Sequence, residues 1–407
     1  MIAQWVTQLR ERWIGRPHRE EALRLEPEID VTLLIVLVAL LALGLLMVYS
    51  ASIPIASVAK ATQGNPFYYL QRQALFVLLG LALAVFVFDV PVRLLERLAP
   101  LVIAVALGLL ALVLVPSIGK VVNGARRWIP LGPFSLQPSE IMKLAVVLFA
   151  ARYAVRKAER LSSKQPLLQS ILHGLGPFLL VMLFAAVLLL REPDFGATLI
   201  VVTTGIVILF MAGLDHRVIV PLAVLAVAAG VALVATESYR LERIMTLLDP
   251  WKEEYRQGYQ LTTSLIAIGR GGVFGLGLGA SVSKHYYLPE AHTDFILAIT
   301  AEELGLVGLL LVIAAYAFIT VRAFRIGRDA ERLEQPFAAG VARGIGVLLG
   351  GQALINIAVN LGLAPTKGLT LPLMSYGGSG MVVTLCALAI LLRIDWENRR
   401  RERGFAV

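Results

Sequence analysis

The feature that most constrains this chain is a series of ten long apolar segments separated by shorter polar stretches. Each segment is long enough to cross a hydrocarbon core of about 30 Å as a helix. The ten segments cover residues 31–53, 74–92, 98–116, 139–155, 173–190, 196–213, 218–235, 294–320, 337–361 and 376–393. We therefore expect an all-α polytopic integral membrane protein with about ten transmembrane helices.

Composition supports this class and excludes others. The 407 residues are 58% hydrophobic and 16% charged, whereas soluble domains have about 25% charged residues. The net charge of +9 is not gathered into basic patches with interleaved aromatic residues, so no nucleic-acid partner is expected. The single cysteine, Cys386, lies inside an apolar segment, which excludes an intrachain disulfide or a cysteine metal site.

Lysine and arginine are more frequent in the tails and short loops on the N-terminal side of the spans than on the opposite side. By the positive-inside rule, both termini are predicted to be cytoplasmic. The expected organisation is an N-terminal tail over 1–30, a membrane domain over 31–393 and a basic C-terminal tail over 394–407. The large extracytoplasmic loop over 236–293 is too long to be structureless, and we expect it to be partly helical.

A polar stretch turns into an apolar helix within residues 289–308, PEAHTDFILAITAEELGLVG. The pattern predicts Asp294 at the start of this helix, at the membrane face, with Glu302 about 12 Å deeper. The structural alternative for Asp294 is a helix cap that satisfies backbone N–H groups. The functional alternative is an acid or base at the membrane surface.

A second acid and a lysine occur together in QPSEIMK, where Pro138 and Ser139 signal a helix start. Glu140 and Lys143 are three residues apart, a spacing at which opposite charges attract on a helix. A local ion pair anchoring the helix end is the structural alternative. Ionisable residues within a membrane are functional candidates by default.

Further cations lie close to predicted span ends. Arg126 and Arg127 precede Trp128, Arg72 lies in FYYLQRQ, and Lys367 lies in APTKGLTLPLMSYGGSG. Contact with lipid phosphates is the structural alternative for the arginines. A phosphate-bearing substrate is the functional one.

Polar residues also mark other loops and one span. Asp194 in REPDFGAT precedes the sixth span, where a cap is the structural alternative. Ser375 lies beside a Gly-Gly turn in the last loop. Gln352, Asn356 and Asn360 recur every four residues in the ninth span, which predicts hydrogen bonding between helices. A shared polar cavity accounts for these loops more economically than several separate caps.

Four motifs occur in order along the chain: QPSEIMK, EPDFGAT, PEAHTDFILAITAEELG and PLMSYGGSG. With these motifs spread across ten spans, the chain resembles the SEDS family (shape, elongation, division and sporulation), over nearly the whole stretch from Leu33 to Arg393. MVYSAS and KGLTLPLMSYGGSG are more similar to the division branch (FtsW) than to the elongation branch (RodA). Two residues depart from the family pattern, Glu192 where a glutamine is expected and Gly380 where a serine is frequent.

The resemblance implies a peptidoglycan glycosyltransferase that polymerises lipid II in the bacterial cytoplasmic (inner) membrane, at the division septum. It implies a class B penicillin-binding protein (FtsI-like) as partner, together with other divisome membrane proteins. Asp294 matches the essential acid of the family, and Glu140 and Lys143 match its QPSExxK pair. The remaining predicted site, for substrate binding, comprises Arg72, Arg126, Arg127, Gln137, Asp194, His292, Lys367 and Ser375.

The chemistry suits these residues. A sugar hydroxyl must attack an anomeric carbon that bears undecaprenyl pyrophosphate, so one group accepts a proton while cations stabilise the leaving phosphates. Asp294 is the predicted general base for the acceptor 4-hydroxyl, with inversion at the donor. No metal-ligand spacing is present, and a divalent cation (Mg²⁺ or Mn²⁺) is left open. The alternatives are a lipid II flippase, which needs charges near the bilayer midplane, a non-catalytic scaffold, and an elongation-type polymerase.

Overall fold

The computed structural model describes residues 29–405 apart from 123, 133, 162–173, 215, 216, 219, 222, 223, 225–227, 229–244, 253–255, 257 and 367. Its helices are α2 (Val31–Val58), η2 (Lys60–Thr62), α3 (Tyr68–Asp89), α4 (Val92–Val113), α5 (Pro138–Leu161), α7 (Gly176–Arg191), α8 (Phe195–Met211), α11 (Tyr259–Gly271), α12 (Ile296–Arg332), α13 (Pro336–Asn360) and α14 (Gly378–Glu402). The predicted helical membrane fold is confirmed.

Six helices are long and apolar enough to cross a membrane, namely α2, α3, α4, α12, α13 and α14. Two shorter apolar helices, α7 and α8, and the more charged α5 match three further predicted spans. The remaining predicted span, 218–235, lies mostly outside the described residues. The predicted helical segment of the long loop is present as α11.

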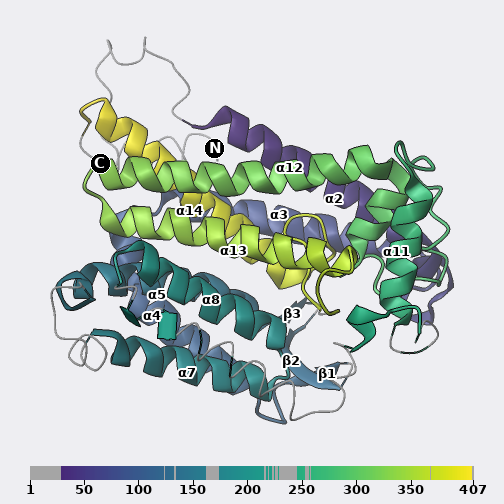
Figure 1. Cartoon of the computed structure of the whole chain (residues 1–407), viewed down its shortest axis with the longest axis horizontal. Helices are drawn as coiled ribbons and strands as arrows, with labels where there is room; N and C mark the ends of the chain where they lie inside the picture. The colour runs from purple at the N-terminus through teal and green to yellow at the C-terminus, as the bar shows by residue number, and fades with distance from the viewer. Residues whose placement is uncertain are drawn as a thin grey trace.

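The helices pack lengthwise into one bundle. α12 and α13 run side by side, α14 packs on α3, and α5 contacts α4, α8 and α13 (Figure 1). Glycines allow the close approach between α13 and its neighbours. A Cβ on Gly344 would lie 2.6 Å from Ile208 and 2.8 Å from Val147, the small-residue packing that helices use inside membranes.

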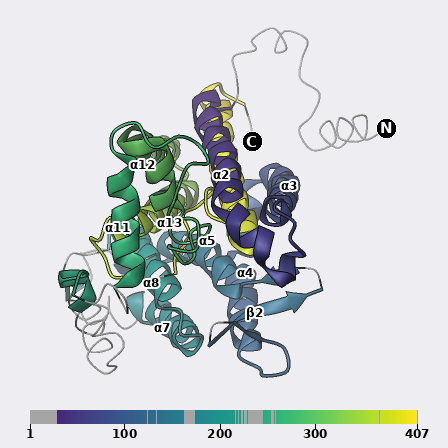
Figure 2. The same cartoon turned by 90° about the vertical axis from the view of Figure 1, so that its right-hand side faces the viewer.

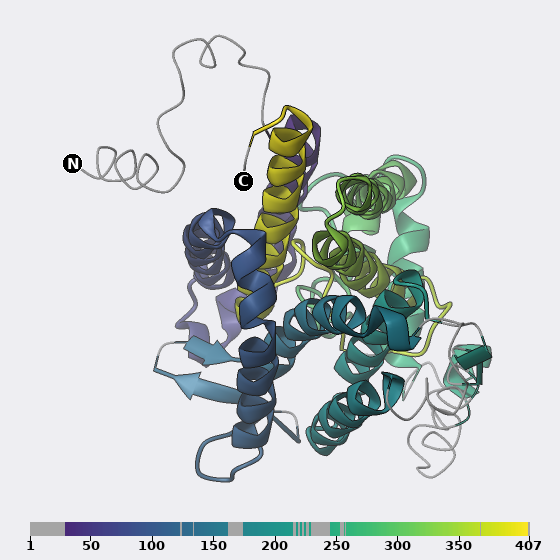
Figure 3. The same ribbon diagram turned by 90° about the vertical axis from the view of Figure 1, so that its left-hand side faces the viewer.

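The bundle has two polar ends. At the first, which we call the terminal end, the start of α2 meets the end of α14, since Arg322 of α12 bonds Asp30 and lies 4.0 Å from Asp395 (Figure 3). The other end, which we call the site end, holds the loops around 137, 193, 293 and 375. The described chain therefore begins and ends at the same end of the bundle, whereas its cytoplasmic orientation stays a prediction.

A small antiparallel sheet covers part of the site end, next to α4 (Figure 2). It consists of β1 (Lys120–Val122), β2 (Ala125–Leu131) and β3 (Phe134–Leu136), in the order β1-β2-β3. The sequence did not predict these strands. β1 and β3 have only three residues each, and β2 contains adjacent arginines and Pro130, so none of them shows a clear alternation of apolar and polar residues. The sheet leads directly into α5 and fixes Arg127 at the site end.

The helix predicted to run unbroken from Asp294 past Gly308 is wrong in two respects. It begins at Ile296, and Gly305 interrupts it with a φ of 69°. A glycine-rich segment over 269–279, GRGGVFGLGLG, fills the break, because Leu276 and Gly277 donate backbone hydrogen bonds to the carbonyls at 302 and 303. Irregular backbone at membrane depth needs such partners inside the protein.

Both acids near this break are fully buried. Glu302 accepts hydrogen bonds from the Ser281 hydroxyl at 2.5 Å and the Ser283 backbone at 3.2 Å. Glu303 pairs with Lys284 at 2.9 Å and accepts from Ser50 of α2 at 2.6 Å. These carboxylates therefore fasten the loop that leads to Asp294 onto α12 and α2.

Helix α14 extends beyond the boundary predicted at residue 394 and ends at Glu402. The residues from Ile394 to Asn398 are buried. Arg393 binds Glu397 at 2.8 Å, and Arg399 binds Asp395 at 2.8 Å. These i,i+4 pairs support the helical continuation of α14 into the predicted basic tail.

Candidate active site

Asp294 ends the loop before α12 and does not cap the helix. The N-cap is Phe295, which makes no side-chain hydrogen bond. The backbone carbonyl of Asp294 accepts from the side-chain amides of Asn356 at 2.9 Å and Asn360 at 3.0 Å. Among the described residues nothing donates a hydrogen bond to its carboxylate. The backbone of Asp294 is thus held in place, while its carboxylate is available to accept a hydrogen bond or a proton from a ligand.

The surroundings of Asp294 favour its protonated form. Burial is the main cause, and the negative charge of Glu290 adds to it, so that the pKa of Asp294 rises to about 7 despite the opposing charge of Arg127. Its Oδ2 lies close to the last loop, where a Cβ on Gly368 would be 3.3 Å away. A carboxyl group with a pKa near neutral can accept and release a proton under physiological conditions.

The last loop clamps the two residues before Asp294. The Ser375 hydroxyl donates to the Thr293 carbonyl at 2.6 Å, and the Tyr376 N–H donates to the His292 carbonyl at 2.9 Å. Gln73 of α3 holds the same loop by donating to the Ser375 carbonyl at 3.1 Å. Ser375 therefore holds the loop of Asp294 in place.

His292 is buried between two tyrosines. Its ring centre lies 4.7 Å from that of Tyr69 and 5.6 Å from that of Tyr376. Its buried Nδ1 has no hydrogen-bond partner in the part of the chain that the structure describes. Burial lowers the pKa of His292, against a smaller raising effect of Glu290. A neutral imidazole at this position can accept or donate one hydrogen bond to a ligand.

Glu140 and Lys143 form the predicted pair. The Lys143 Nζ lies 2.8 Å from the Glu140 carboxylate and donates to Gln352 of α13 at 3.0 Å. Gln352 in turn donates to the Thr370 carbonyl in the last loop at 2.9 Å. Only 3% of the Lys143 side chain is exposed, which makes the pair part of the interior and not a surface ion pair.

Asp194 joins α8 to α5. It caps α8 by accepting from the Ala197 N–H at 3.0 Å, so the capping alternative is correct. Its other oxygen accepts from Ser139 at 3.3 Å and from Gln137 at 3.5 Å. Asp194 thereby aligns the start of α5, and the Glu140 that follows it, with the α7–α8 turn.

Arg127, Arg126 and Arg72 contact different parts of the structure. Arg127 of β2 donates to the Glu192 carbonyl at 2.9 Å and acts electrostatically on Asp294, so it belongs to the site. Arg126 instead donates to the Leu114 carbonyl at 3.0 Å, at the end of α4. Arg72 contacts the Tyr68 hydroxyl at 2.7 Å, one helical turn from Tyr69. Lys367 lies outside the described residues.

The polar stripe of α13 organises the site. Gln352, Asn356 and Asn360 hold both the last loop and the loop of Asp294, since Asn356 also donates to the Leu369 carbonyl at 2.6 Å. The predicted hydrogen bonding between helices is confirmed, because Gln352 accepts from Lys143 of α5 at 3.0 Å and Asn360 accepts from the Ala298 N–H of α12 at 3.1 Å. The stripe also donates to loop carbonyls, which the sequence did not predict. Gln73 was not among the predicted site residues, although a glutamine beside Arg72 in an apolar span is a usable signal.

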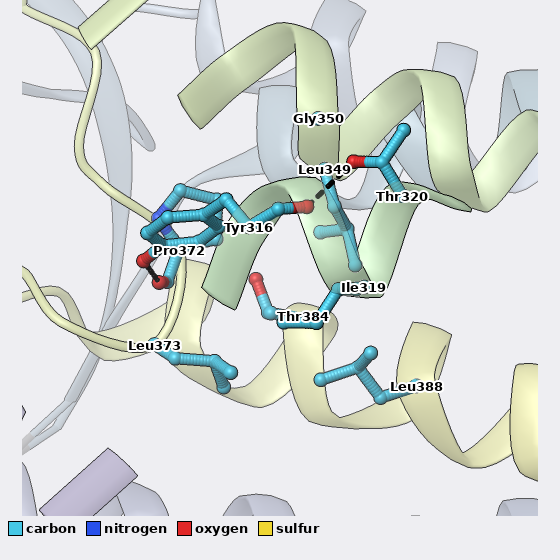
Figure 4. A pocket seen from close by; sticks show the side chains of 9 residues that line it. All are labelled: Tyr316, Ile319, Thr320, Leu349, Gly350, Pro372, Leu373, Thr384 and Leu388. Carbon is cyan, nitrogen blue, oxygen red and sulfur yellow. Dashed lines mark hydrogen bonds between the residues drawn. The ribbon is translucent and has the colours of Figure 1, made fainter. Parts of the chain in front are cut away.

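Two pockets lie away from these residues. Tyr316, Pro372 and Thr384 line a narrow apolar one between α12, α13 and α14 with no room for a ligand; the Tyr316 hydroxyl binds the Pro372 carbonyl there (Figure 4). An open cavity of about 450 Å³ lies at the terminal end beside Asp30 and Arg322. Within the described ranges no three His, Cys, Asp or Glu side chains form a metal site, and a divalent cation stays a prediction.

Fold and site together define a multi-pass helical membrane protein with an acid, a buried ion pair and an arginine gathered at one end. The chain belongs to the FTSW_RODA_SPOVE family of cell cycle proteins, whose model matches residues 31–400.

Similar proteins agree with this assignment. The chain is 47% identical to a protein named "Probable peptidoglycan glycosyltransferase FtsW" of Nitrosomonas europaea, over 95% of this chain and 97% of that one. It is 49% identical to a protein of the same name from Burkholderia thailandensis, over 96% and 82% of the two chains.

Solved structures share the fold. One is a chain of a peptidoglycan synthase complex described for the structural coordination of polymerization and crosslinking. It has a TM-score of 0.71 and 30% identity over 91% of this chain and 98% of that one. Another is the rod shape determining protein RodA of Thermus thermophilus, with a TM-score of 0.64 and 30% identity over 93% and 98%.

Proposed function

We propose that this chain is a peptidoglycan glycosyltransferase that polymerises lipid II into glycan strands during septal synthesis in cell division. The observation that carries the proposal is Asp294. Its side chain is partly buried, its carboxylate receives no hydrogen bond from the described residues, and its pKa is about 7, the properties of a general base. Relatives at 47–49% identity carry the name of this activity over nearly the whole chain.

In the proposed reaction, the 4-hydroxyl of an acceptor GlcNAc attacks the anomeric carbon of the donor. Asp294 takes the hydroxyl proton, the new C–O bond forms, and the bond from the anomeric carbon to the pyrophosphate oxygen breaks. The electron pair leaves with undecaprenyl pyrophosphate. Attack opposite the leaving group inverts an α-linked donor to a β-1,4 product, and a pyrophosphate leaves without protonation, so one carboxylate is sufficient.

Cations balance the charge that develops on the leaving group. Arg127 is one candidate, because its charge acts on Asp294. Lys143 is held by Glu140 and Gln352 at hydrogen-bond distance, so it supplies a positioned charge with little freedom to move. Arg72, Gln137, Asp194, His292 and Ser375 line or support the same end of the bundle.

The pH dependence of the rate follows from Asp294. The base is the ionised form, and its fraction increases as the pH rises through the raised pKa of about 7. At pH 5 the ionised fraction is therefore about 100-fold smaller than at its plateau. The turnover of lipid II at saturating substrate should fall in parallel, and a rate unchanged between pH 7 and pH 5 would contradict the assignment.

The proposal includes a class B penicillin-binding protein that crosslinks the strands and contacts the long loop between residues 236 and 293. A structural neighbour from a peptidoglycan synthase complex supports such a partner. The hydrogen bonds and the ion pair of Glu302 and Glu303 hold this loop on the helix that follows Asp294, which supports the loop as the route by which the partner acts on Asp294. With both termini cytoplasmic, the site end faces outward, where lipid II and other divisome proteins meet it.

The test is purified protein reconstituted in liposomes with lipid II, assayed for glycan chains with and without the class B partner. Glycan chains formed by the wild-type chain and absent with Asp294→Asn support the proposal. Transfer of lipid II across the bilayer without glycan product favours a flippase. Neither product favours a scaffold.

A further inference from the structure

Glu192 is a buried acid that the proposed mechanism leaves unused. It is the C-cap residue of α7 and is 0% exposed. Neither of its carboxyl oxygens has a hydrogen-bond partner among the described residues. Glu302 is equally buried but accepts hydrogen bonds from Ser281 and Ser283. Burying an ionised carboxylate without donors is very unfavourable, so Glu192 is expected to be protonated.

The charged groups around Glu192 come from two elements. Asp194 lies on the same turn, and Arg127 reaches it from β2. The start of α5 meets this turn through the uncharged Gln137 and Ser139, which both bind Asp194. Burial, followed by the charge of Asp194, raises the pKa of Glu192 to about 8 against the smaller effect of Arg127.

Arg127 connects this turn to Asp294. Its Nε donates to the Glu192 carbonyl at 2.9 Å, and its guanidinium also binds the Pro193 carbonyl. The turn therefore holds Arg127 through neutral backbone groups. The same guanidinium lowers the pKa of Asp294. An ionised Glu192 would add a negative charge beside Arg127 and weaken its attraction for an anionic phosphate.

We propose that Glu192 is a positioning residue that works as a neutral acid, filling the turn that holds Arg127 without neutralising the charge that Arg127 offers to the substrate pyrophosphate. This inference rests on the proposed glycosyltransferase function. It predicts that ionisation of Glu192 acts mainly on the KM for lipid II and much less on kcat. Glutamine has nearly the shape of the neutral acid, so Glu192→Gln should keep the activity.

The first experiment measures kcat and KM for lipid II between pH 6 and pH 9.5 for the wild type, Glu192→Gln and Arg191→Gln. The wild-type KM should rise above pH 8, by about tenfold at pH 9. Glu192→Gln should match the wild type at pH 7 and show no such rise. Arg191→Gln is the control, because this exposed neighbour changes the charge without reaching the buried carboxyl, and it should keep the wild-type rise.

Two outcomes overturn the proposal. One is an equal rise of KM in the wild type and in Glu192→Gln. The other is a loss of more than tenfold in kcat/KM at pH 7 for folded Glu192→Gln, which would mean that the ionised form is needed.

A second measurement does not depend on activity. An acid whose pKa is raised on folding stabilises fully below its unfolded pKa, and that contribution is lost as the pH rises to the folded value. For Glu192 this window runs from 4.5 to about 8. The Tm of the wild type should therefore fall relative to Glu192→Gln across this window and stay parallel above it.

A Tm difference that is independent of pH would refute a neutral Glu192. Binding of undecaprenyl pyrophosphate at pH 7 and pH 9 tests the phosphate step separately. Affinity should fall in the wild type and not in Glu192→Gln, and equal losses would refute the role of Glu192. If the binding and Tm results hold but no variant makes glycan, the proposed function fails while the protonation of Glu192 stands.

Discussion

Two acids at the site end, Asp294 and Glu192, differ from the buried acids at the terminal end. At the terminal end each buried acid lies against an arginine: Asp30 with Arg322, Asp395 with Arg399, and Glu397 with Arg393. At the site end the carboxylates of Asp294 and Glu192 receive no hydrogen bond from the described residues. The arginine partners hold helices together at the terminal end, whereas burial raises the pKa values of Asp294 and Glu192 to near neutral.

The pKa values of Asp30 and Asp294 follow this difference. Burial by itself raises the pKa of Asp30, but the Leu33 N–H and the charge of Arg322 lower it below its ordinary value. Burial raises the pKa of Asp294 to about 7, because no comparable donor opposes it. The same side chain thus performs a structural task at one end and is suited to proton transfer at the other.

The largest effect is expected for Asp294→Asn. Asparagine is nearly isosteric and leaves the backbone carbonyl with Asn356 and Asn360, so folding and lipid II binding should be preserved. Loss of the general base should reduce polymerisation by about 10²-fold or more. Glycan product, lipid II binding and Tm should be measured on the same preparation.

The matched control for this change is Asp30→Asn, which removes a carboxylate at the terminal end. If Asp294→Asn makes near-normal amounts of polymer and has an unchanged Tm, Asp294 is not the general base, and the proposed functional difference between the two ends is wrong.

An intermediate effect is expected for the Glu140–Lys143 ion pair of the site. Glu140→Gln and Lys143→Met each leave a buried polar partner unmatched, and each should lower polymerisation by about tenfold or more. The double variant should lose less than the product of the single losses, with a coupling of about 0.5–3 kcal/mol. Additive losses in this double-mutant cycle would show that the two residues act separately.

The smallest effect is expected for Asp30→Asn itself. Asparagine still caps α2, so only the partly exposed pair with Arg322 is lost, at a cost of about 1 kcal/mol in stability. Because the pKa of Asp30 is lowered, the stability that it contributes is present above pH 3.8 and is lost as the pH falls through the folded pKa. Thermal unfolding from pH 3 to pH 7 should show the Tm values of wild type and variant converging at the acidic end. A changed kcat in this variant would contradict a purely structural terminal end.

The sequence by itself determined the fold class and the main chemical groups. Apolar segments of about 20 residues can only cross a bilayer as helices, because their backbone groups must be satisfied internally. The spacing of Glu140 and Lys143 predicted a pair that the structure contains. The i,i+4 stripe of α13 predicted buried hydrogen bonds, and they are present. Such local signals suffice because helical geometry alone brings these residues onto one face.

Only the tertiary structure decided how these groups act together. The break of α12 at Gly305 was not predicted, since it depends on the glycine-rich segment that pairs with it from another part of the chain. Nor did the sequence separate Arg127 from Arg126, which are neighbours on one strand but bind carbonyls of different helix ends. Whether a carboxylate is paired, and hence whether it holds its proton, depends on donors that are distant in sequence. That is the physical reason why Asp294 and Glu192 differ from Asp30.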